Sequence, residues 1–307
     1  MKIAVIFTGG TIGSKIAEDG YISVDTKIYK LIEMYWEKVD VRMDFITREP
    51  YSILSENLNF EHIDMLVECV RELLEEGEVE GILITHGTDT LQYSAAILSH
   101  FFGKARVPII LVSSAYVLED PRSNGFDNFV KAVDYITNVS PYYDFESEYD
   151  SRVMVSYKNS DGKHRFIGGN RLDNPRPFTG DLYEVTSPIK PVKVYDSIRK
   201  LAPVSGSVLR IQACPGMLYP DLDSSSYDQV KTVMLETYHS GTLCIDNALR
   251  NFIDKAEKRN ISVHLTGLAS GTAEYETVKA YDELGIIVDY DEAPISCYCR
   301  LVIECAE

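Results

Sequence analysis

Two short apolar runs, each followed by a turn rich in glycine and threonine, most constrain the fold of this chain. The first, at residues 2–7, leads into TGGTIG at residues 8–13, and the second, at residues 81–84, leads into THGTDT at residues 85–90. Runs this short before a glycine-containing turn are typical of buried strands. Because ligands bind beyond the carboxyl ends of strands in open α/β sheets, the polar side chains of both turns are expected at the mouth of a crevice.

The first turn is open to two interpretations. Gly9 and Gly10 allow the backbone to bend sharply and to approach a ligand closely, which leaves Thr11 as a candidate nucleophile. The turn matches neither the dinucleotide-binding pattern GxGxxG nor the phosphate-binding pattern GxxxxGK[ST], so a plain structural loop fits it equally well. The second turn favours a functional site, since two strand ends of one sheet then each present a threonine, the second beside a carboxylate.

Strand and helix patterns alternate along the first part of the chain. The predicted helices lie at residues 25–36, 63–74, 91–98 and 126–136. Asp25 is the expected N-cap of the first, and Gly77 is the expected C-cap of the second. The predicted strands lie at residues 41–45, 81–84 and 107–112, with a β-hairpin at residues 152–168. Regular alternation of this kind indicates a mostly parallel sheet.

Prolines 188, 191 and 203 interrupt regular structure and predict a linker. Beyond it, strands are expected at residues 208–211, 232–235 and 261–265, and helices at residues 251–259 and 274–284. Residues 293–302 fit either a helix or a strand. The predicted fold class is α/β, with a doubly wound, mostly parallel N-terminal domain at residues 1–187, a linker at 188–206 and a smaller flavodoxin-like α/β domain at 207–307.

Composition excludes some kinds of partner. The 307 residues are 45% hydrophobic, which is ample for two cores, and the formal net charge is −17. Nucleic acid and anionic membranes are disfavoured as partners, because both need clustered lysine and arginine. The chain shows no targeting segment and no apolar run of membrane-spanning length, so the cytoplasm is the expected compartment.

The six cysteines form no CxxC pair and are too sparse for a disulfide scaffold. Most are therefore expected to be small core residues. Cys297 and Cys299 are spaced as same-face strand residues or near neighbours would be, and metal binding there is disfavoured because no histidine lies near them in the sequence. We expect no metal.

Together, TGGTIG and THGTDT resemble the bacterial-type L-asparaginase family, and the resemblance extends more loosely to residues 122–128 and 235–242. It favours the cytoplasmic type I branch. The resemblance implies hydrolysis of a small amino-acid amide without a cofactor, in a homodimer or homotetramer whose sites are completed by the neighbour's C-terminal domain. Glu274 and Tyr275 are candidates for that contribution.

The resemblance also implies roles for individual residues. Thr11 would attack the side-chain amide with help from Tyr21, and Thr88 would position or activate the water. Asp89 would pair with the α-ammonium group of the substrate, which Glu56 would also contact, while Ser55 would hold the α-carboxylate. The remaining expected substrate-binding residues are Gly10, Ser114 and Ala115. His86 is interpreted as a hydrogen-bonded structural imidazole.

One position departs from the family. Where the family usually carries lysine in GNRVTK, this chain reads GNRLDN at residues 169–174, so Asn174 stands in the lysine position. Asparagine is no base, and its presence would weaken water activation by about 10²-fold or more unless Arg176 or Lys163 supplies a nearby cation. Three hypotheses therefore stay open: release of ammonia from L-asparagine, amidase activity on another amide such as glutamine or a modified asparagine, and an amino-acid-binding or regulatory homologue without turnover.

Overall fold

The computed structural model describes residues 1–16, 21–24, 29–39, 42–139, 151–176, 179–186, 189–271 and 275–307. The chain divides into two compact units. The first contains Met1–Glu184 and Pro191–Ile198, and the second contains Val185–Lys190 and Arg199–Glu307. The segment expected as a linker is thus shared between the units. Among the described residues, no helix combines the length and apolar character needed to cross a bilayer.

The first unit is built on a six-stranded sheet with the order β4-β1-β5-β6-β7-β8. Its strands are β1 (Lys2–Phe7), β4 (Asp44–Arg48), β5 (Gly81–Thr85), β6 (Ile109–Val112), β7 (Val153–Lys158) and β8 (His164–Gly168). All neighbours run parallel except β7 and β8, which form the predicted hairpin. A separate two-stranded hairpin joins β2 (Ser14–Ile16) and β3 (Ile22–Val24). The carboxyl ends of β1 and β5 therefore lie side by side.

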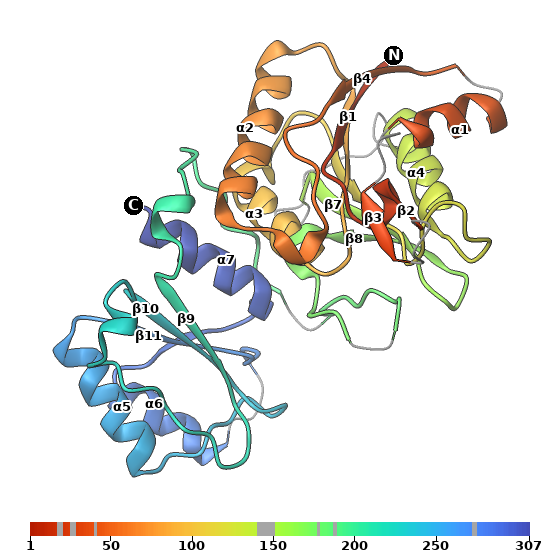
Figure 1. The fold of residues 1–307 in the computed structure, drawn as a ribbon. Coiled ribbons are helices and arrows are strands. Elements are labelled where there is room, and N and C mark those ends of the chain that lie inside the picture. Colours follow the sequence, from red (N-terminus) through yellow and green to blue (C-terminus); the bar gives the residue numbers. More distant parts are fainter. Residues whose placement is uncertain are drawn as a thin grey trace. The chain divides into compact units, whose positions relative to one another are not determined.

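Helices lie on both sides of this sheet (Figure 1). They are α1 (Lys30–Lys38), α2 (Phe60–Glu76), α3 (Leu91–Phe102) and α4 (Gly125–Asp134). Figure 1 shows α2 and α3 on one side and α1 and α4 on the other. Alternate residues of β1 form a core with α1 and α4 that includes Val5, Leu31 and Phe129. The sheet is doubly wound, as predicted.

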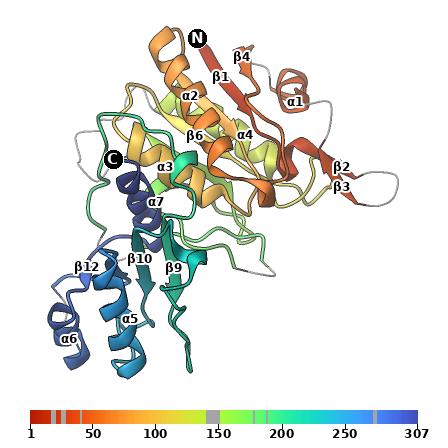
Figure 2. The ribbon, with the colours of Figure 1, turned by 60° about the vertical axis from the view of Figure 1, so that its left-hand side comes forward.

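The second unit contains a parallel four-stranded sheet with the order β12-β11-β10-β9. The strands are β9 (Val208–Gln212), β10 (Thr232–Glu236), β11 (Ser262–Thr266) and β12 (Ile287–Asp289), and the helices are α5 (Asn247–Lys258), α6 (Lys279–Glu283) and α7 (Pro294–Cys305). Residues of α5 and α6 pack with alternate strand residues in one apolar core, while α7 contacts β9 and β10 (Figure 2). The α/β fold class is confirmed.

Several local predictions can be compared with the structure. Helix α2 ends at Gly77, which adopts the expected left-handed conformation (φ 77°). Helix α1 begins after its N-cap Tyr29, while Asp25, the predicted cap, lies outside the described residues. Trp36, the last residue of the predicted helix, is 52% exposed and donates from Nε1 to the Met43 carbonyl. The ambiguous segment at residues 293–302 is a helix.

Candidate active site

Backbone hydrogen bonds fix the turn that follows β1. The Gly10 amide donates to the Ile53 carbonyl (2.9 Å), and the Gly10 carbonyl accepts from the Gly13 amide (3.0 Å) and from the Ser14 hydroxyl (2.7 Å). Thr11 begins the short 3-10 turn Thr11–Gly13 and is partly exposed. The hydroxyl of Thr8 is already used, because it donates to the Thr85 carbonyl at the end of β5 (2.6 Å). Thr8 is therefore structural, and the role of Thr11 as nucleophile stays a prediction.

The two glycine turns pack directly against each other. A Cβ atom added to Gly10 would lie 2.3 Å from the Gly87 nitrogen and 2.4 Å from its Cα. A Cβ added to Gly87 would lie 2.4 Å from the Ser55 Oγ and 3.1 Å from the Gly10 Cα. No side chain fits in either place. The residues that follow these glycines, Thr11 and Thr88, are thereby brought into one neighbourhood together with Ser55.

Polar contacts hold the Ser55 turn to the turn after β5. The Ser55 hydroxyl donates to the Asp89 Oδ2 (3.2 Å), and the Thr90 hydroxyl donates to the Ser55 carbonyl (2.9 Å). Ser55 is buried, whereas Asp89 and Glu56 are exposed. The Asp89 carboxylate is thus positioned by a neutral donor and stays accessible to a cationic ligand.

His86 is a structural residue behind this site. Its Nδ1 lies 2.8 Å from the Gly87 carbonyl, and its Nε2 lies 2.8 Å from the Ser94 Oγ on α3. Because a carbonyl can only accept, Nδ1 carries the proton and Nε2 accepts from Ser94. Burial lowers the pKa of His86 to about 4, although the bond to the Gly87 carbonyl opposes this shift. The ring is therefore neutral and supports the peptide that precedes Thr88.

A further loop is tied to the site by Asn124, a residue that the sequence analysis did not single out. Its Oδ1 accepts from the Ala115 amide (2.9 Å), and its Nδ2 donates to the Lys158 carbonyl at the end of β7 (2.8 Å). Ser114 is fully buried, and its hydroxyl donates to the Tyr116 carbonyl (2.5 Å). Ser114 is therefore a support for the loop, while Ala115 is the part of it that can meet a ligand. A polar RSNG sequence before a helix was the available signal for Asn124.

A cavity of about 550 Å³ opens beside Thr88. It is lined by Thr88, Asp89, Ala115, Tyr116, residues 175–176 and residues 179–182. Thr11 and Ser55 are not among its described lining residues. The wall at residues 179–182 was not anticipated, because this segment is irregular and carries no periodic signal. Arg176, predicted as a nearby cation, does line the cavity, while Lys163 lies in the exposed β7–β8 turn and does not.

The positions of the remaining predicted site residues say little about their roles. Tyr21 directly precedes β3 and is 76% exposed. The Asn174 amide donates to the Asp173 Oδ1 (2.8 Å). Tyr275 is 60% exposed in the second unit, and Glu274 lies outside the described residues.

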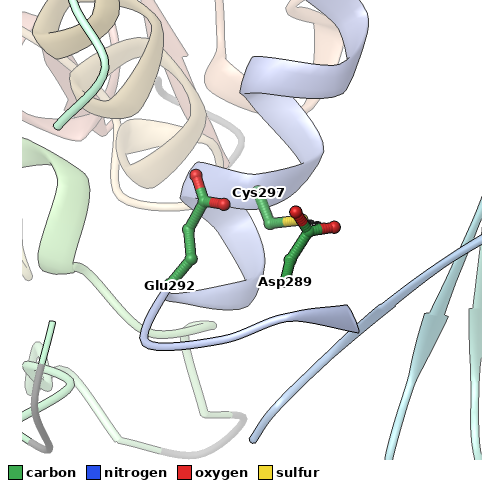
Figure 3. Close-up of side chains that lie close together, drawn as sticks. All are labelled: Asp289, Glu292 and Cys297. Carbon is green, nitrogen blue, oxygen red and sulfur yellow. Dashed lines mark hydrogen bonds between the residues drawn. The ribbon is translucent and has the colours of Figure 1, made fainter. Parts of the chain in front are cut away.

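The second unit holds, at the start of α7, a buried cluster of residues whose side chains are of the kinds that bind metals (Figure 3). The ligand atoms of Asp289, Glu292 and Cys297 lie within 4.8 Å of one another, and His264 Nδ1 is 2.8 Å from the Asp289 Oδ2. A histidine that is distant in sequence therefore contacts this cluster through Asp289. The reason is that neighbouring parallel strands place His264 and Asp289 together although they are distant in sequence.

This cluster nevertheless already contains its cation. The Arg300 guanidinium lies 2.6 Å from the Asp289 Oδ1, 3.0 Å from the Glu292 Oε2 and 3.5 Å from the Cys297 Sγ. Burial and the nearby carboxylates raise the pKa of the Cys297 thiol, so it stays protonated and is a poor metal ligand. The residues present fit an arginine-centred ion network and do not fit a metal site.

Comparison with known proteins agrees with this geometry. Residues 2–142 match the family described as "Asparaginase, N-terminal". The chain is 37% identical over 133 residues to a component of the glutamyl-tRNA(Gln) amidotransferase of Methanococcus vannielii, a match that covers 43% of this chain and only 30% of that protein. It is 26% identical to L-asparaginase 1 of Escherichia coli K12, covering 93% of this chain and 86% of that protein.

A solved structure shares the fold of the whole chain. The thermostable L-asparaginase from Thermococcus kodakarensis is similar with a TM-score of 0.75 at 20% identity, covering 100% of this chain and 93% of that one. The family match contains both glycine turns and the Ser55 turn. Residues 2–142 thus match the asparaginase N-terminal family, and the resemblance of the chain to the bacterial-type L-asparaginases is confirmed.

Proposed function

We propose that this protein is an amidohydrolase that releases ammonia from L-asparagine to give L-aspartate through a threonine ester. The close packing of Gly10 against Gly87 is the observation that carries the proposal, because it brings Thr11 and Thr88 to adjacent strand ends. Hydrolysis through an ester needs both a nucleophile and a positioned water. The asparaginase relatives support asparagine as the amide.

In the first step, the Thr11 hydroxyl oxygen attacks the carboxamide carbon of the substrate. Backbone amides of the glycine turn stabilise the oxyanion. The carbon–nitrogen bond then breaks, and the proton lost by Thr11 leaves with ammonia. Tyr21, which directly precedes β3 and is 76% exposed, assists this proton transfer.

In the second step, Thr88 positions a water molecule that attacks the ester carbon. Aspartate is released and the proton returns to Thr11. Asp89 and Glu56 bind the α-ammonium group, and Ser55 binds the α-carboxylate, with Gly10 and Ala115 completing the site. Because the Ser55 hydroxyl has a single proton, it turns from the Asp89 Oδ2 (3.2 Å) to the α-carboxylate when substrate binds, and Asp89 then pairs with the α-ammonium group.

A second candidate function follows from Asn174. Without a base at this position, the protein would bind an amino acid with little or no turnover and act as a binding or regulatory protein. Activity on glutamine or another amide is a third candidate. We do not propose the activity of the glutamyl-tRNA(Gln) amidotransferase relatives for this protein. The match spans less than a third of their length, and a net charge of −17 disfavours tRNA as a partner.

Ammonia release from L-asparagine tests the proposal. The native protein should release ammonia and aspartate in equal amounts, and a Thr11→Ala variant should release neither above background. A Thr8→Ser variant is the matched control, because it keeps the structural hydroxyl in the same turn and should keep the activity. If the native protein binds asparagine in calorimetry but matches Thr11→Ala in ammonia release, the binding function is correct instead.

Assembly and compartment are part of the proposal. We propose a homodimer or homotetramer, with Tyr275 of one copy placed to reach the site of another. All six cysteines are free thiols, which suits the reducing cytoplasm.

A further inference from the structure

The cavity beside Thr88 is larger than asparagine requires. Its volume of about 550 Å³ falls within the roughly 300–1,000 Å³ typical of sites for drug-sized ligands. Asparagine is a small molecule, and the proposed contacts of its α-ammonium and α-carboxylate groups are with Ser55, Glu56 and Asp89. A substrate that extends beyond the amide would use the remaining space.

The position of Thr88 gives the direction of that extension. This step rests on the proposed function, in which water attacks the ester carbon after the amine has left. The residue that positions the water therefore lies beside the place of the leaving nitrogen. The cavity is lined by Thr88 and by Asp89, the proposed partner of the α-ammonium group, but not by Ser55, so it includes the leaving-group side and lies away from the α-carboxylate.

The charges of the cavity wall indicate what the extension carries. Asp181 is already satisfied, because its two carboxylate oxygens accept from the Ser160 amide and hydroxyl, each at 2.7 Å. The Arg176 guanidinium stacks 4.0 Å from the Tyr183 ring centroid, and its contact with the Asp173 carboxylate is long, at 4.0 Å. The Arg176 side chain is 60% exposed and keeps donors for a ligand. A planar guanidinium held in this way suits a carboxylate.

We infer that the site also takes the β-amide that aspartate forms with the amine of a second amino acid, and that Arg176 binds the carboxylate of that second amino acid. Thr11 attacks the β-carbonyl carbon, and the carbon–nitrogen bond breaks. The proton lost by Thr11 goes to the departing α-amine, so that an amino acid leaves in place of ammonia. Water then releases aspartate as before. Arg176 thus selects the leaving group.

The test compares L-asparagine, β-aspartyl-alanine and β-aspartyl-alaninamide, with release of aspartate, ammonia and alanine followed by chromatography. The uncapped dipeptide should have a kcat/KM about 10-fold or more above that of asparagine, and the capped dipeptide should lose about 10–100-fold, as expected for one charge-assisted pair. An Arg176→Ala variant should lower the ratio of dipeptide to asparagine kcat/KM by the same 10–100-fold. Arg71→Ala, which removes an arginine paired with glutamates on α2, should leave the ratio unchanged.

The outcomes separate this inference from the proposed function. Turnover of asparagine without cleavage of either dipeptide overturns the inference alone. Equal losses for both substrates in Arg176→Ala also overturn it, since Arg176 would then assist the common chemistry. If no substrate is turned over, the proposed function and the inference fail together.

Discussion

Adding a methyl group to Gly10 tests the contact between the two turns. In Gly10→Ala, the new Cβ would lie 2.3 Å from the Gly87 nitrogen, whereas real Cβ atoms essentially never approach closer than 3.0 Å. The turns must therefore separate by about 0.7 Å, the difference between these distances. A side chain at φ 73° and ψ −179°, a region open essentially only to glycine, costs about 1–3 kcal/mol, and overpacking adds about 1–3 kcal/mol. We expect a loss of about 2–6 kcal/mol in the free energy of unfolding.

The same displacement should also slow catalysis. A displacement near 1 Å between a nucleophile and its partners costs on the order of 10²-fold in rate, so kcat for ammonia release should fall by about that factor. Urea unfolding and an ammonia assay measure the two quantities.

Gly77→Ala is the matched control. Gly77 shares the positive φ (77°) but has a ψ of 10°, the left-handed helical region, against −179° at Gly10, and its added Cβ would meet nothing closer than 3.7 Å. This variant should lose only about 1–2 kcal/mol and keep its kcat. If Gly10→Ala and Gly77→Ala behave alike in both assays, the turns are not in contact as described and the reasoning fails.

Other changes test the rest of the structure. The pKa of His86 falls from 6.5 to about 4 on folding, so the unfolded state takes up a proton first as the pH drops. The free energy of unfolding should therefore fall by about 3 kcal/mol between pH 6.5 and 4. Urea titrations should show a smaller loss in His86→Gln, and an equal loss in both proteins would refute the prediction. Arg300→Met removes the cation shared by Asp289 and Glu292 and leaves only Lys190 on Glu292 (3.0 Å) and His264 on Asp289 (2.8 Å), so the unfolding free energy should drop by about 3 kcal/mol, and a drop below about 1 kcal/mol would contradict the network. Asn174→Lys should raise kcat for asparagine by up to about 10²-fold, and an unchanged kcat would mean that this position plays no part in water activation.

The sequence was sufficient to predict most of the strands and the parallel sheet, but it missed the short strands β2, β3 and β12 and placed β4 three residues too early. Short apolar runs before glycine have few alternatives, and Gly77 ended its helix as expected because a left-handed C-cap requires a residue without a side chain. Segment 293–302 was ambiguous for a physical reason. As helix α7 it is buried on nearly all sides, so its sequence lacks the polar stripe that marks a surface helix.

The cavity wall was beyond sequence reasoning. Residues 179–182 have no regular structure of their own and are positioned by the β7–β8 turn, through hydrogen bonds such as those from Ser160 to Asp181 and from Asn159 to the Leu182 carbonyl. The approach of His264 to Cys297 likewise depends on strand register and on the fold of α7. Both arise from contacts between residues that are distant in the chain.

The most direct measurement looks for the threonine ester itself. A Thr88→Val variant keeps the shape of the side chain but removes the hydroxyl that positions water, so the ester should accumulate when the variant is mixed with asparagine and quenched with acid. Peptide mass spectrometry should then find an aspartyl group on Thr11, and a Thr88→Val variant that also carries Thr11→Ala should show none. An aspartyl group on a different residue, or ammonia release by the native protein with no ester trapped on Thr11, would contradict the account.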